Sequence, residues 1–288
     1  MPNKERRRRY EEQSNKKIIQ HVLMATFALI MIYPLIWMVS SSLKESSSVF
    51  VDSHSLIPEG WHFENYIDGW SGFAGITFGT FFWNSFVITI IATVGSIASS
   101  TLIAFGFARI KFAGKKIWFV SMMLTMMLPF EMVMIPQYIM FNGFGWIDTY
   151  LPLILPTFFG IPFFIFLIMQ FIRTIPMELD EAAKIDGCNT FDIFFRIIVP
   201  LIIPAMMTSA IFSFYWRWDD FMGPLIYLST PEKYPVSLAL KLFSDPNSVT
   251  NWGAMFAMST LSILPIFVIF FVFQRYIVDG ISSTGMKA

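Results

Sequence analysis

The sequence predicts an all-α polytopic membrane protein that crosses the bilayer six times. Hydrophobic residues make up 55% of the 288-residue chain, charged residues make up only 14%, and the mean hydropathy is +0.60. A soluble globule of this size needs more polar surface than this composition supplies. The apolar residues also gather in nearly uncharged runs of about 20 residues, the length that a helix needs to cross the hydrocarbon core.

The first predicted span is the uncharged run at 18–43. Residues 1–17 precede it and hold seven bases but nothing apolar around which they could fold, so we expect a cytoplasmic N-terminal arm. The run is longer than a signal-peptide core and lacks a small-residue cleavage site, which favours an uncleaved helix. A basic arm could instead bind anionic lipid or nucleic acid, but beside a span the positive-inside role is favoured.

The second predicted span, 84–108, follows an aromatic loop at 44–83. That loop has five acids and one base, so we expect it outside and partly in the membrane interface. The span carries small residues at every fourth position, which lets a neighbouring helix approach closely in lipid. These residues are Ala92, Ser96, Ser100, Ala104 and Ala108.

The third predicted span, 117–140, is interrupted by Pro129 and Pro136, and Glu131 lies between them. Each proline frees backbone carbonyls that lipid cannot satisfy, so such a helix lies against other helices or a wet cavity. Two interpretations stay open. Glu131 and Gln137 lie near a polar substrate path, or Glu131 is a buried partner of an interhelical donor or an interfacial residue.

Three further spans are predicted at 149–172, 197–216 and 254–273. With these spans, 18–276 forms the transmembrane domain, and 277–288 forms a cytoplasmic C-terminal tail. Sixteen of the 20 lysines and arginines then fall on the predicted inner side. This distribution places both termini in the cytoplasm.

The segment between spans four and five, about 174–196, is charged but has clear helix signals. Pro176 fits the first helical position, and the acids that follow it favour the positive end of a helix. Gly187 fits the left-handed residue that ends a helix. We therefore expect a helix from Met177 to Asp186, about 16 Å long, with Ala182 and Ala183 on its surface where another protein could bind.

A second, amphipathic helix is predicted after Gly187. Asn189 or Thr190 can cap it, and Asp192 faces Arg196 one turn on. The stripe expected on its apolar face consists of Phe191, Phe194, Phe195 and Ile198.

The spacing in this loop resembles a known motif. Glu181-Ala182-Ala183 is followed after three residues by Gly187, and after nine more by Ile197, one residue, Val199 and Pro200. This pattern resembles the EAA loop of permease subunits of binding-protein-dependent ABC importers, with Val199 where leucine is usual. From Tyr33 onward the chain is similar to the carbohydrate-uptake branch, typified by the smaller permease of the maltose transporter.

This resemblance implies a subunit that forms half of the translocation pathway for a sugar, in that branch an oligosaccharide, delivered by an extracytoplasmic solute-binding protein. It also implies a bacterial-type cell membrane, a second homologous permease in a heterodimer, and a dimeric ATPase subunit that binds ATP and Mg. The loop helix would lie in a groove of that ATPase. The coupling residues carried over are Glu181, Ala182, Ala183, Asp186, Gly187, Ile197 and Pro200.

The end of the fifth span, YWRWDDF, resembles the Trp-Asn-Asp-Phe segment of the same family, with Asp219 in place of the usual asparagine. Aromatic rings and carboxylates together suit a sugar site, and they are also typical of an ordinary membrane interface. The residues that could contact substrate here are Tyr215, Trp216, Asp219 and Asp220.

The sequence lacks the motifs of an enzyme. No GxxxxGK[ST] occurs, because Arg109 stands where the first glycine would be, and the three histidines have no metal-ligand spacing. The single cysteine, Cys188, excludes an internal disulfide. We expect no catalytic residue, no metal or other cofactor in this chain, and no nucleic-acid partner. The alternatives are a permease for a non-sugar solute and a stand-alone secondary transporter, which would show internal repeats.

Overall fold

The computed structural model describes residues 2–72, 75–243 and 251–285, with side chains for 17–72, 75–241, 243 and 251–276. All regular structure in these ranges is helical. Four helices are long and apolar enough to cross a membrane, and the number rises to six if each of two bent helix pairs is one span. The chain is thus an all-α membrane protein, as its composition predicted.

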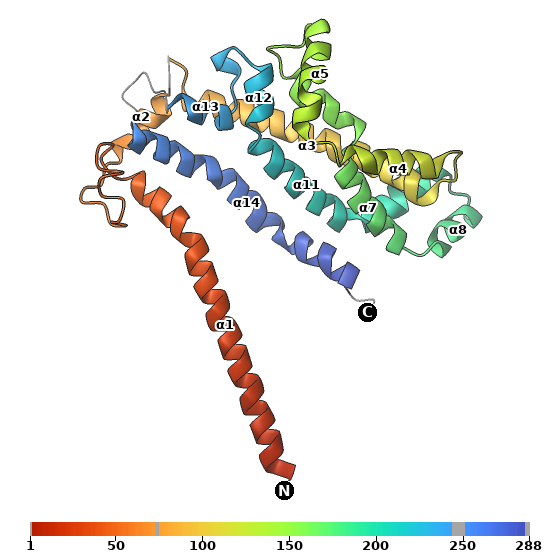
Figure 1. Cartoon of the computed structure of the whole chain (residues 1–288). Coiled ribbons are helices and arrows are strands. Elements are labelled where there is room, and N and C mark those ends of the chain that lie inside the picture. Colours follow the sequence, from red (N-terminus) through yellow and green to blue (C-terminus); the bar gives the residue numbers. More distant parts are fainter. Residues whose placement is uncertain (1, 73–74, 244–250, 286–288) are drawn as a thin grey trace. The chain divides into compact units, whose positions relative to one another are not determined.

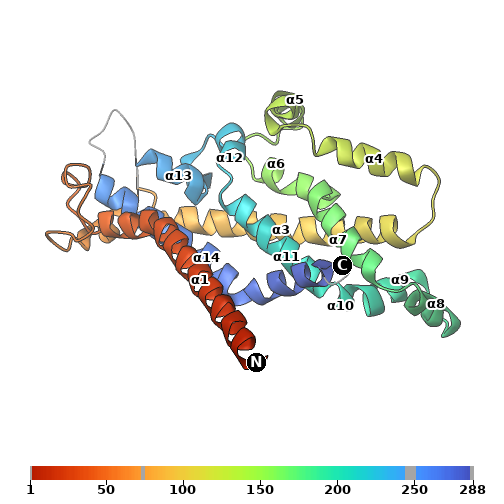
Figure 2. The same cartoon turned by 60° about the horizontal axis from the view of Figure 1, so that its bottom comes forward.

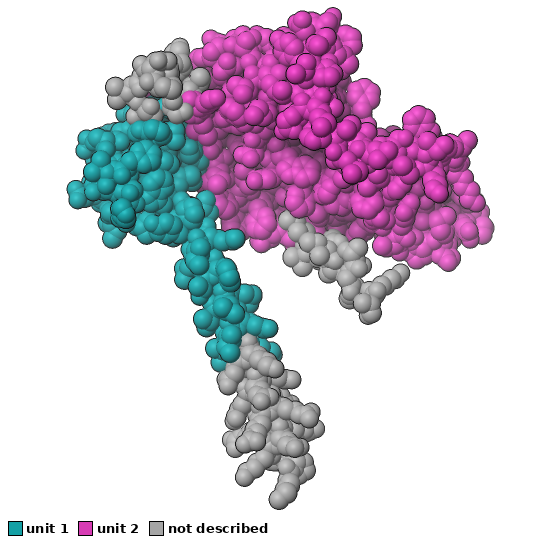
Figure 3. Space-filling view, in the orientation of Figure 1, with its two compact units in different colours: residues 1–70, 243–261 teal, residues 71–242, 262–288 magenta. Residues whose placement is uncertain are grey.

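The elements follow one another in this order (Figure 1): α1 (Pro2–Ser41), α2 (Glu64–Ser71), α3 (Phe78–Arg109), α4 (Lys115–Thr125), α5 (Phe130–Gly143), α6 (Leu151–Ile154), the 3-10 helix η1 (Leu155–Phe159), α7 (Pro162–Thr174), α8 (Glu178–Ile185), α9 (Thr190–Asp192), the π-helix η2 (Ile193–Ile198), α10 (Val199–Leu201), α11 (Ile203–Trp218), α12 (Met222–Tyr227), the 3-10 helix η3 (Pro231–Lys233), α13 (Val236–Leu242) and α14 (Trp252–Gly285). The chain divides into two compact units, coloured separately in Figure 3 and described in turn below. Unit 1 holds Met1–Trp70 and Phe243–Leu261, and unit 2 holds Ser71–Leu242 and Ser262–Ala288.

In unit 1, the first span and the arm before it form one helix. We expected the arm to have nothing around which to fold, but α1 already begins at Pro2. A helix that is already nucleated in the span extends at low cost through arginine, lysine and glutamate, which are good helix formers. The side chains of residues 1–16, which carry nearly all of the predicted basic arm, lie outside the described residues.

The loop after α1 in unit 1 is folded around a buried lysine. The Lys44 ammonium donates to the carbonyls of Asp52 (2.8 Å) and Ser55 (2.6 Å), which offsets the burial of its charge. Aromatic rings then close the loop, with the Phe50 ring centroid 4.8 Å from Trp252. This predicted external loop is therefore compact in its own right.

In unit 2, α3 lies alongside α7 and α11 (Figures 1 and 2). The helix begins at Phe78, six residues before the predicted start at Asn84. Phe78 and Phe81 are fully buried, so the aromatic residues that suggested an interfacial loop instead extend the helix into the core.

The predicted row of small residues on α3 is confirmed as a packing face. Ala92, Ser96, Ser100 and Ala104 are fully buried. The Ser96 hydroxyl lies 3.0 Å from the Ser213 hydroxyl of α11, and the Ser100 hydroxyl accepts a hydrogen bond from the backbone N–H of Ile161 (3.0 Å). Small side chains therefore bring the neighbouring helices within hydrogen-bond distance of α3.

The third and fifth predicted spans are sharply bent. α4 and α5 make an angle of 100°, and the break falls just before Pro129, whereas Pro136 is accommodated inside α5. The segment Thr190–Leu201 meets α11 at 73°, so the straight part of the fifth span begins at Ile203, after the predicted start at 197. Pro200 and Pro204 lie in the first turns of α10 and α11, where the missing N–H of proline is tolerated.

The last helix runs from the predicted external loop into the predicted tail. Within unit 2 it is held by the Trp218 indole N–H, which donates to the Ser262 carbonyl (2.9 Å). The helical backbone continues to Gly285, so residues 277–285 of the tail predicted at 277–288 extend the last span in helical form. Residues 244–250 of the loop, residues 286–288 and the side chains beyond 276 lie outside the described part of the chain.

Replacing Ser96 with leucine tests the close approach of α3 and α11. Because Ser96 has no exposed surface and touches Ser213, the larger side chain overpacks the contact and is expected to destabilise the fold by about 1–3 kcal/mol. Thermal unfolding of the protein in detergent measures this loss. Val94→Leu, on the exposed side of the same turn, is the matched control, and equal melting temperatures for the two variants would contradict the close contact.

Candidate functional site

The charged loop contains the predicted first helix in a shorter form. α8 covers Glu178–Ile185, eight residues or about 12 Å, with Met177 as its N-cap. Pro176 therefore precedes the helix, and its predicted place at the first helical position is wrong. Glu178, Asp180 and Glu181 do occupy the first turn, where the helix dipole favours acids.

Gly187 ends α8 in the way that the sequence predicted. Its φ of +86° is left-handed, the conformation that glycine adopts without strain. The Cys188 N–H donates to the Ala183 carbonyl (2.9 Å) and the Gly187 N–H to the Lys184 carbonyl (3.1 Å), which together form a Schellman motif. The bend after α8 is therefore fixed by hydrogen bonds.

The second part of the loop agrees with the prediction at its start and differs later. The Asn189 side chain caps α9 by accepting from the N–H groups of Phe191 (2.9 Å) and Asp192 (3.0 Å), and Asp192 pairs with Arg196 at 3.2 Å. The chain then turns into the π-helix η2. Its i→i+5 hydrogen bonds give more residues per turn than an α-helix has, so residues three and four apart no longer lie on one face. The predicted apolar stripe is therefore wrong.

Only two members of that predicted stripe reach the core. Phe194 and Ile198 are buried, together with Ile193, whereas Phe191 and Phe195 are 72% and 62% exposed. The Phe194 ring lies 5.0 Å from the Phe105 ring of α3. The loop is thus packed onto the end of α3 and presents two phenyl rings outward.

The predicted coupling residues are divided between surface and core. Ala182, Glu181, Asp186 and Gly187 are exposed, and so is Pro200. Ala183 instead packs into the core cluster that includes Ala104, Phe105 and Ile172, with Ile197 partly buried against it. The prediction that both alanines lie on the surface is therefore wrong for Ala183, because α8 turns that side toward its own chain.

Arg109 and Asp180 form a buried ion pair that the sequence analysis missed. Arg109 Nε lies 3.1 Å from Asp180 Oδ2, and the two side chains are only 6% and 5% exposed. Arg109 lies in the last turn of α3, and Asp180 lies in the first turn of α8. Their separation along the chain gave no local signal that they would meet.

A pocket of about 250 Å³ lies within unit 2, between α5, α6, α11 and α12. Its lining residues are Phe130, Gln137, Pro152, Leu153, Pro156, Arg217, Asp220, Gly223 and Tyr227. Of the predicted pathway residues, Gln137 and Asp220 line it. The sequence analysis did not select Arg217 or Tyr227.

The polar groups of this pocket come from α5, α11, α12 and the linker between α11 and α12. The Tyr227 hydroxyl donates to Gln137 Oε1 (3.3 Å), and Arg217 Nη1 lies 3.7 Å from Asp220 Oδ2. The other Asp220 oxygen, Oδ1, accepts from the Gly223 N–H (3.0 Å). The pocket thus combines donors and acceptors with apolar walls, as small-molecule sites do.

The remaining predicted pathway residues do not line the pocket. Glu131 is exposed in the first turn of α5, and Asp219 is exposed at the C-cap of α11. Tyr215 and Trp216 are also partly exposed, and the Trp216 ring stacks on Phe164 with a centroid distance of 5.3 Å. In the part of the chain that the structure describes, no group of three or more His, Cys, Asp or Glu side chains could hold a metal ion.

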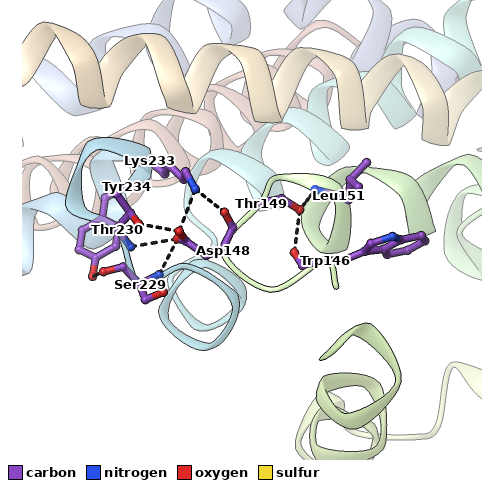
Figure 4. Close-up of polar contacts among 8 residues, drawn as sticks. All are labelled: Trp146, Asp148, Thr149, Leu151, Ser229, Thr230, Lys233 and Tyr234. Atoms are coloured by element: carbon purple, nitrogen blue, oxygen red, sulfur yellow. Dashed lines mark hydrogen bonds and ion pairs between the residues drawn. The ribbon is translucent and has the colours of Figure 1, made fainter. Parts of the chain in front are cut away.

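Asp148 joins the segment before α6 to the segment after α12 through a set of polar contacts (Figure 4). Its carboxylate accepts hydrogen bonds from the N–H groups of Ser229 (3.0 Å) and Thr230 (2.9 Å) and from Lys233 Nζ (2.8 Å). Its own N–H donates to the carbonyl of Tyr227 (2.8 Å), which lines the pocket. Lys233 and the other donors lower the pKa of the Asp148 carboxyl well below its usual range.

Asp148→Asn is expected to lower the melting temperature at neutral pH, because the amide cannot pair with Lys233. A depressed pKa means that the carboxylate stabilises the folded state above its ordinary pKa of 3.8 and loses this effect as the pH falls through its folded value. Melting curves between pH 7 and pH 3 should therefore show the difference from wild type shrinking below pH 3.8. Glu232→Gln, an exposed acid nearby, serves as the control, and a difference independent of pH would contradict this role.

Known proteins resemble this chain over nearly its whole length. It is 36% identical to the "Probable ABC transporter permease protein YurM" of Bacillus subtilis (strain 168), covering 92% of this chain and 87% of that protein. It is 32% identical to the arabinooligosaccharides transport system permease protein AraQ of the same organism, covering 90% and 92%. Its fold matches a chain in the crystal structure of a bacterial ABC transporter involved in the import of the acidic polysaccharide alginate (TM-score 0.75, 23% identity, 90% and 95% covered).

These findings, together with the membrane-spanning helices, define a multi-pass subunit of a membrane transport system. The family model described as "Binding-protein-dependent transport system inner membrane component" matches residues 97–283, and the chain belongs to this family. The family resemblance predicted from the EAA spacing is confirmed. The matched range includes the charged loop and the Arg217–Tyr227 side of the pocket.

Proposed function

We propose that this chain forms half of the translocation pathway of an ATP-driven ABC importer for a sugar, most simply an oligosaccharide, which an extracytoplasmic binding protein delivers. The similarity to AraQ across nine tenths of both chains is the observation that carries this proposal. The pocket chemistry supports it, since a sugar offers hydroxyl groups to Gln137, Asp220 and Tyr227 and an apolar ring face to the walls.

The exposed side of α8 is the proposed docking surface for a separate, dimeric ATPase subunit, which binds ATP and Mg. Ile185 is 87% exposed at the end of this helix, with Glu181, Ala182 and Asp186 around it. An apolar side chain surrounded by charges suits the groove of a partner protein. The family resemblance supports this assignment, because Glu181, Ala182, Gly187, Ile197 and Pro200 all belong to the EAA spacing.

In this proposal both termini and the charged loop face the cytoplasm, as the distribution of basic residues favours. A second, homologous permease completes the pathway as a heterodimer. Nucleotide and the loaded binding protein both bias an equilibrium between inward- and outward-facing states, which is how two distant sites become coupled. The whole assignment is tested by measuring uptake of a labelled oligosaccharide into proteoliposomes. We expect uptake to depend on ATP and on a co-purified ATPase. Uptake by this chain alone, driven by an ion gradient, would refute the assignment.

Gly187→Val is expected to abolish ATPase binding and uptake while the protein still inserts. A left-handed conformation costs an L-residue about 1–2 kcal/mol, and a β-branched residue at φ +86° costs more than that. Relief of this strain would change the bend after α8. Gly187→Asn is the matched control, because asparagine tolerates this conformation and no atom lies within 4 Å of an added Cβ. ATPase co-purification is the measurement, with Glu181→Lys as an independent disruption. Normal binding by both disruptive variants would refute docking at α8.

Asp220→Asn and Tyr227→Phe are expected to raise the sugar concentration needed for half-maximal stimulation of the ATPase by about tenfold, the effect of losing one good hydrogen bond. Both replacements keep the size of the side chain. Met222→Ala, an exposed change nearby, should leave this concentration unchanged. If both pocket variants needed the same sugar concentration as wild type for half-maximal stimulation, Asp220 and Tyr227 would be excluded from the pathway.

The same measurement separates the two interpretations of the exposed aromatic residues. Tyr215→Ala or Trp216→Ala should alter stimulation if these side chains, with Glu131 and Asp219, belong to the proposed pathway. An unchanged response would identify Tyr215 and Trp216 as membrane-interface anchors.

A further inference from the structure

The end of α3 is joined to α8 by a set of contacts from one side chain. Arg109, in the last turn of α3, reaches Asp180 with Nε (3.1 Å), the Ile175 carbonyl with Nη2 (2.8 Å) and the Met177 sulfur with Nη1 (2.7 Å). These three partners lie before and inside α8. The guanidinium therefore holds both the entry to the helix and its first turn.

The Arg109–Asp180 pair is better suited to fixing geometry than to adding stability. A buried pair loses the hydration of both ions, and apolar residues of similar volume often replace such a pair without loss of stability. Within the described residues, Asp180 Oδ1 accepts no hydrogen bond and Arg109 Nε donates none, so the contact between the two is a charge–charge contact that only partly offsets their burial. Direction comes instead from the other two guanidinium nitrogens, which donate to the Ile175 carbonyl and the Met177 sulfur and so orient the planar group beside Asp180.

A second attachment, made by packing, joins α8 to the same end of α3. Ala183 lies in one core cluster with Ala104 and Phe105 of α3 and with Ile172 of α7. The chain connection on the C-terminal side of α8 is less direct. The route toward α11 passes through the Gly187 bend, the π-helix η2 and a turn of 73°.

We propose that Arg109 and Asp180 are positioning residues that transmit movement of α8 to α3. This inference rests on the proposed docking of an ATPase at α8. When α8 is displaced, the ion pair and the hydrogen bond from Arg109 to the Ile175 carbonyl carry α3 with it, and α3 is packed along α7 and α11. The end of α11 supplies Arg217 to the pocket, so α3 connects the loop to the pathway more directly than the bent route through Pro200.

The test uses the full complex of both permeases, the ATPase and the binding protein, reconstituted in proteoliposomes. Arg109→Met and Asp180→Asn are each compared with the exposed controls Arg173→Met and Glu232→Gln, which lie outside α8. The readout is the amount of oligosaccharide taken up per ATP hydrolysed, with ATPase binding measured separately. We expect Arg109→Met and Asp180→Asn to bind the ATPase and hydrolyse ATP while uptake per ATP falls by about tenfold, within the usual range for coupling between two sites.

The double variant Arg109→Met/Asp180→Leu covers the case in which a single change leaves a buried charge unpaired and prevents folding. It replaces both ions by apolar groups and is expected to fold, yet to remain poorly coupled. A covalent link then provides the rescue. In a protein from which Cys188→Ser removes the only cysteine, Arg109→Cys and Asp180→Cys are joined by a short bifunctional thiol reagent. The cross-linked protein should recover the coupling that the unlinked protein lacks.

Wild-type uptake per ATP in Arg109→Met, Asp180→Asn and the double variant would overturn the proposal. So would a parallel fall of uptake and hydrolysis in folded protein, or no recovery on cross-linking, because either result indicates a merely structural pair. Failure of the proposed function gives a different pattern. In that case the unmodified chain itself neither retains an ATPase nor supports ATP-dependent uptake.

Discussion

Close packing along the small-residue face of α3 is the constraint on which the rest of unit 2 depends. In a bilayer, apolar surface gains nothing by leaving lipid for protein, so helices associate where their backbones can approach closely. Ser96 and Ser100 allow this approach and each forms a hydrogen bond across the contact, to Ser213 and to the Ile161 N–H. α7 and α11 take their positions beside α3 from this contact.

The two ends of α3 hold opposite parts of unit 2. At its first turns, the Asn84 amide donates to the carbonyls of Glu232 and Tyr234 (2.8 and 3.0 Å), and the Ser85 hydroxyl accepts from the Val236 N–H (2.8 Å). That segment is also clamped by Asp148 through Lys233. At the last turn, Arg109 holds the entry to α8. A single helix thus links the wall beside the pocket to the charged loop.

Local chemistry made part of this arrangement predictable from the sequence. The four-residue spacing of small side chains in α3, the left-handed Gly187, the Asn189 cap and the Asp192–Arg196 pair all depend on residues a few positions apart. The membrane class followed from composition, and the family from the EAA spacing. Each of these features is decided within a turn or two of helix, where sequence neighbours are also spatial neighbours.

Features that depend on distant contacts were missed or wrong. The Arg109–Asp180 pair joins separate segments, and the pocket gathers Gln137, Arg217 and Tyr227 from different helices. The π-helix η2 replaced the expected α-helix, so Phe191 and Phe195 point outward although their spacing predicted burial beside Phe194. Ala183 turned inward because tertiary packing selects which face of α8 is buried.

In the proposed function, α8 and its bend lie on the cytoplasmic side, at the inner end of α3. The only cysteine of the chain, Cys188, lies directly after the bend and is partly accessible. Labelling it with a membrane-impermeant thiol reagent in sealed vesicles of known orientation is the most direct measurement. The account predicts labelling in inside-out vesicles and none in right-side-out vesicles. Labelling confined to right-side-out vesicles would place the loop outside and contradict it.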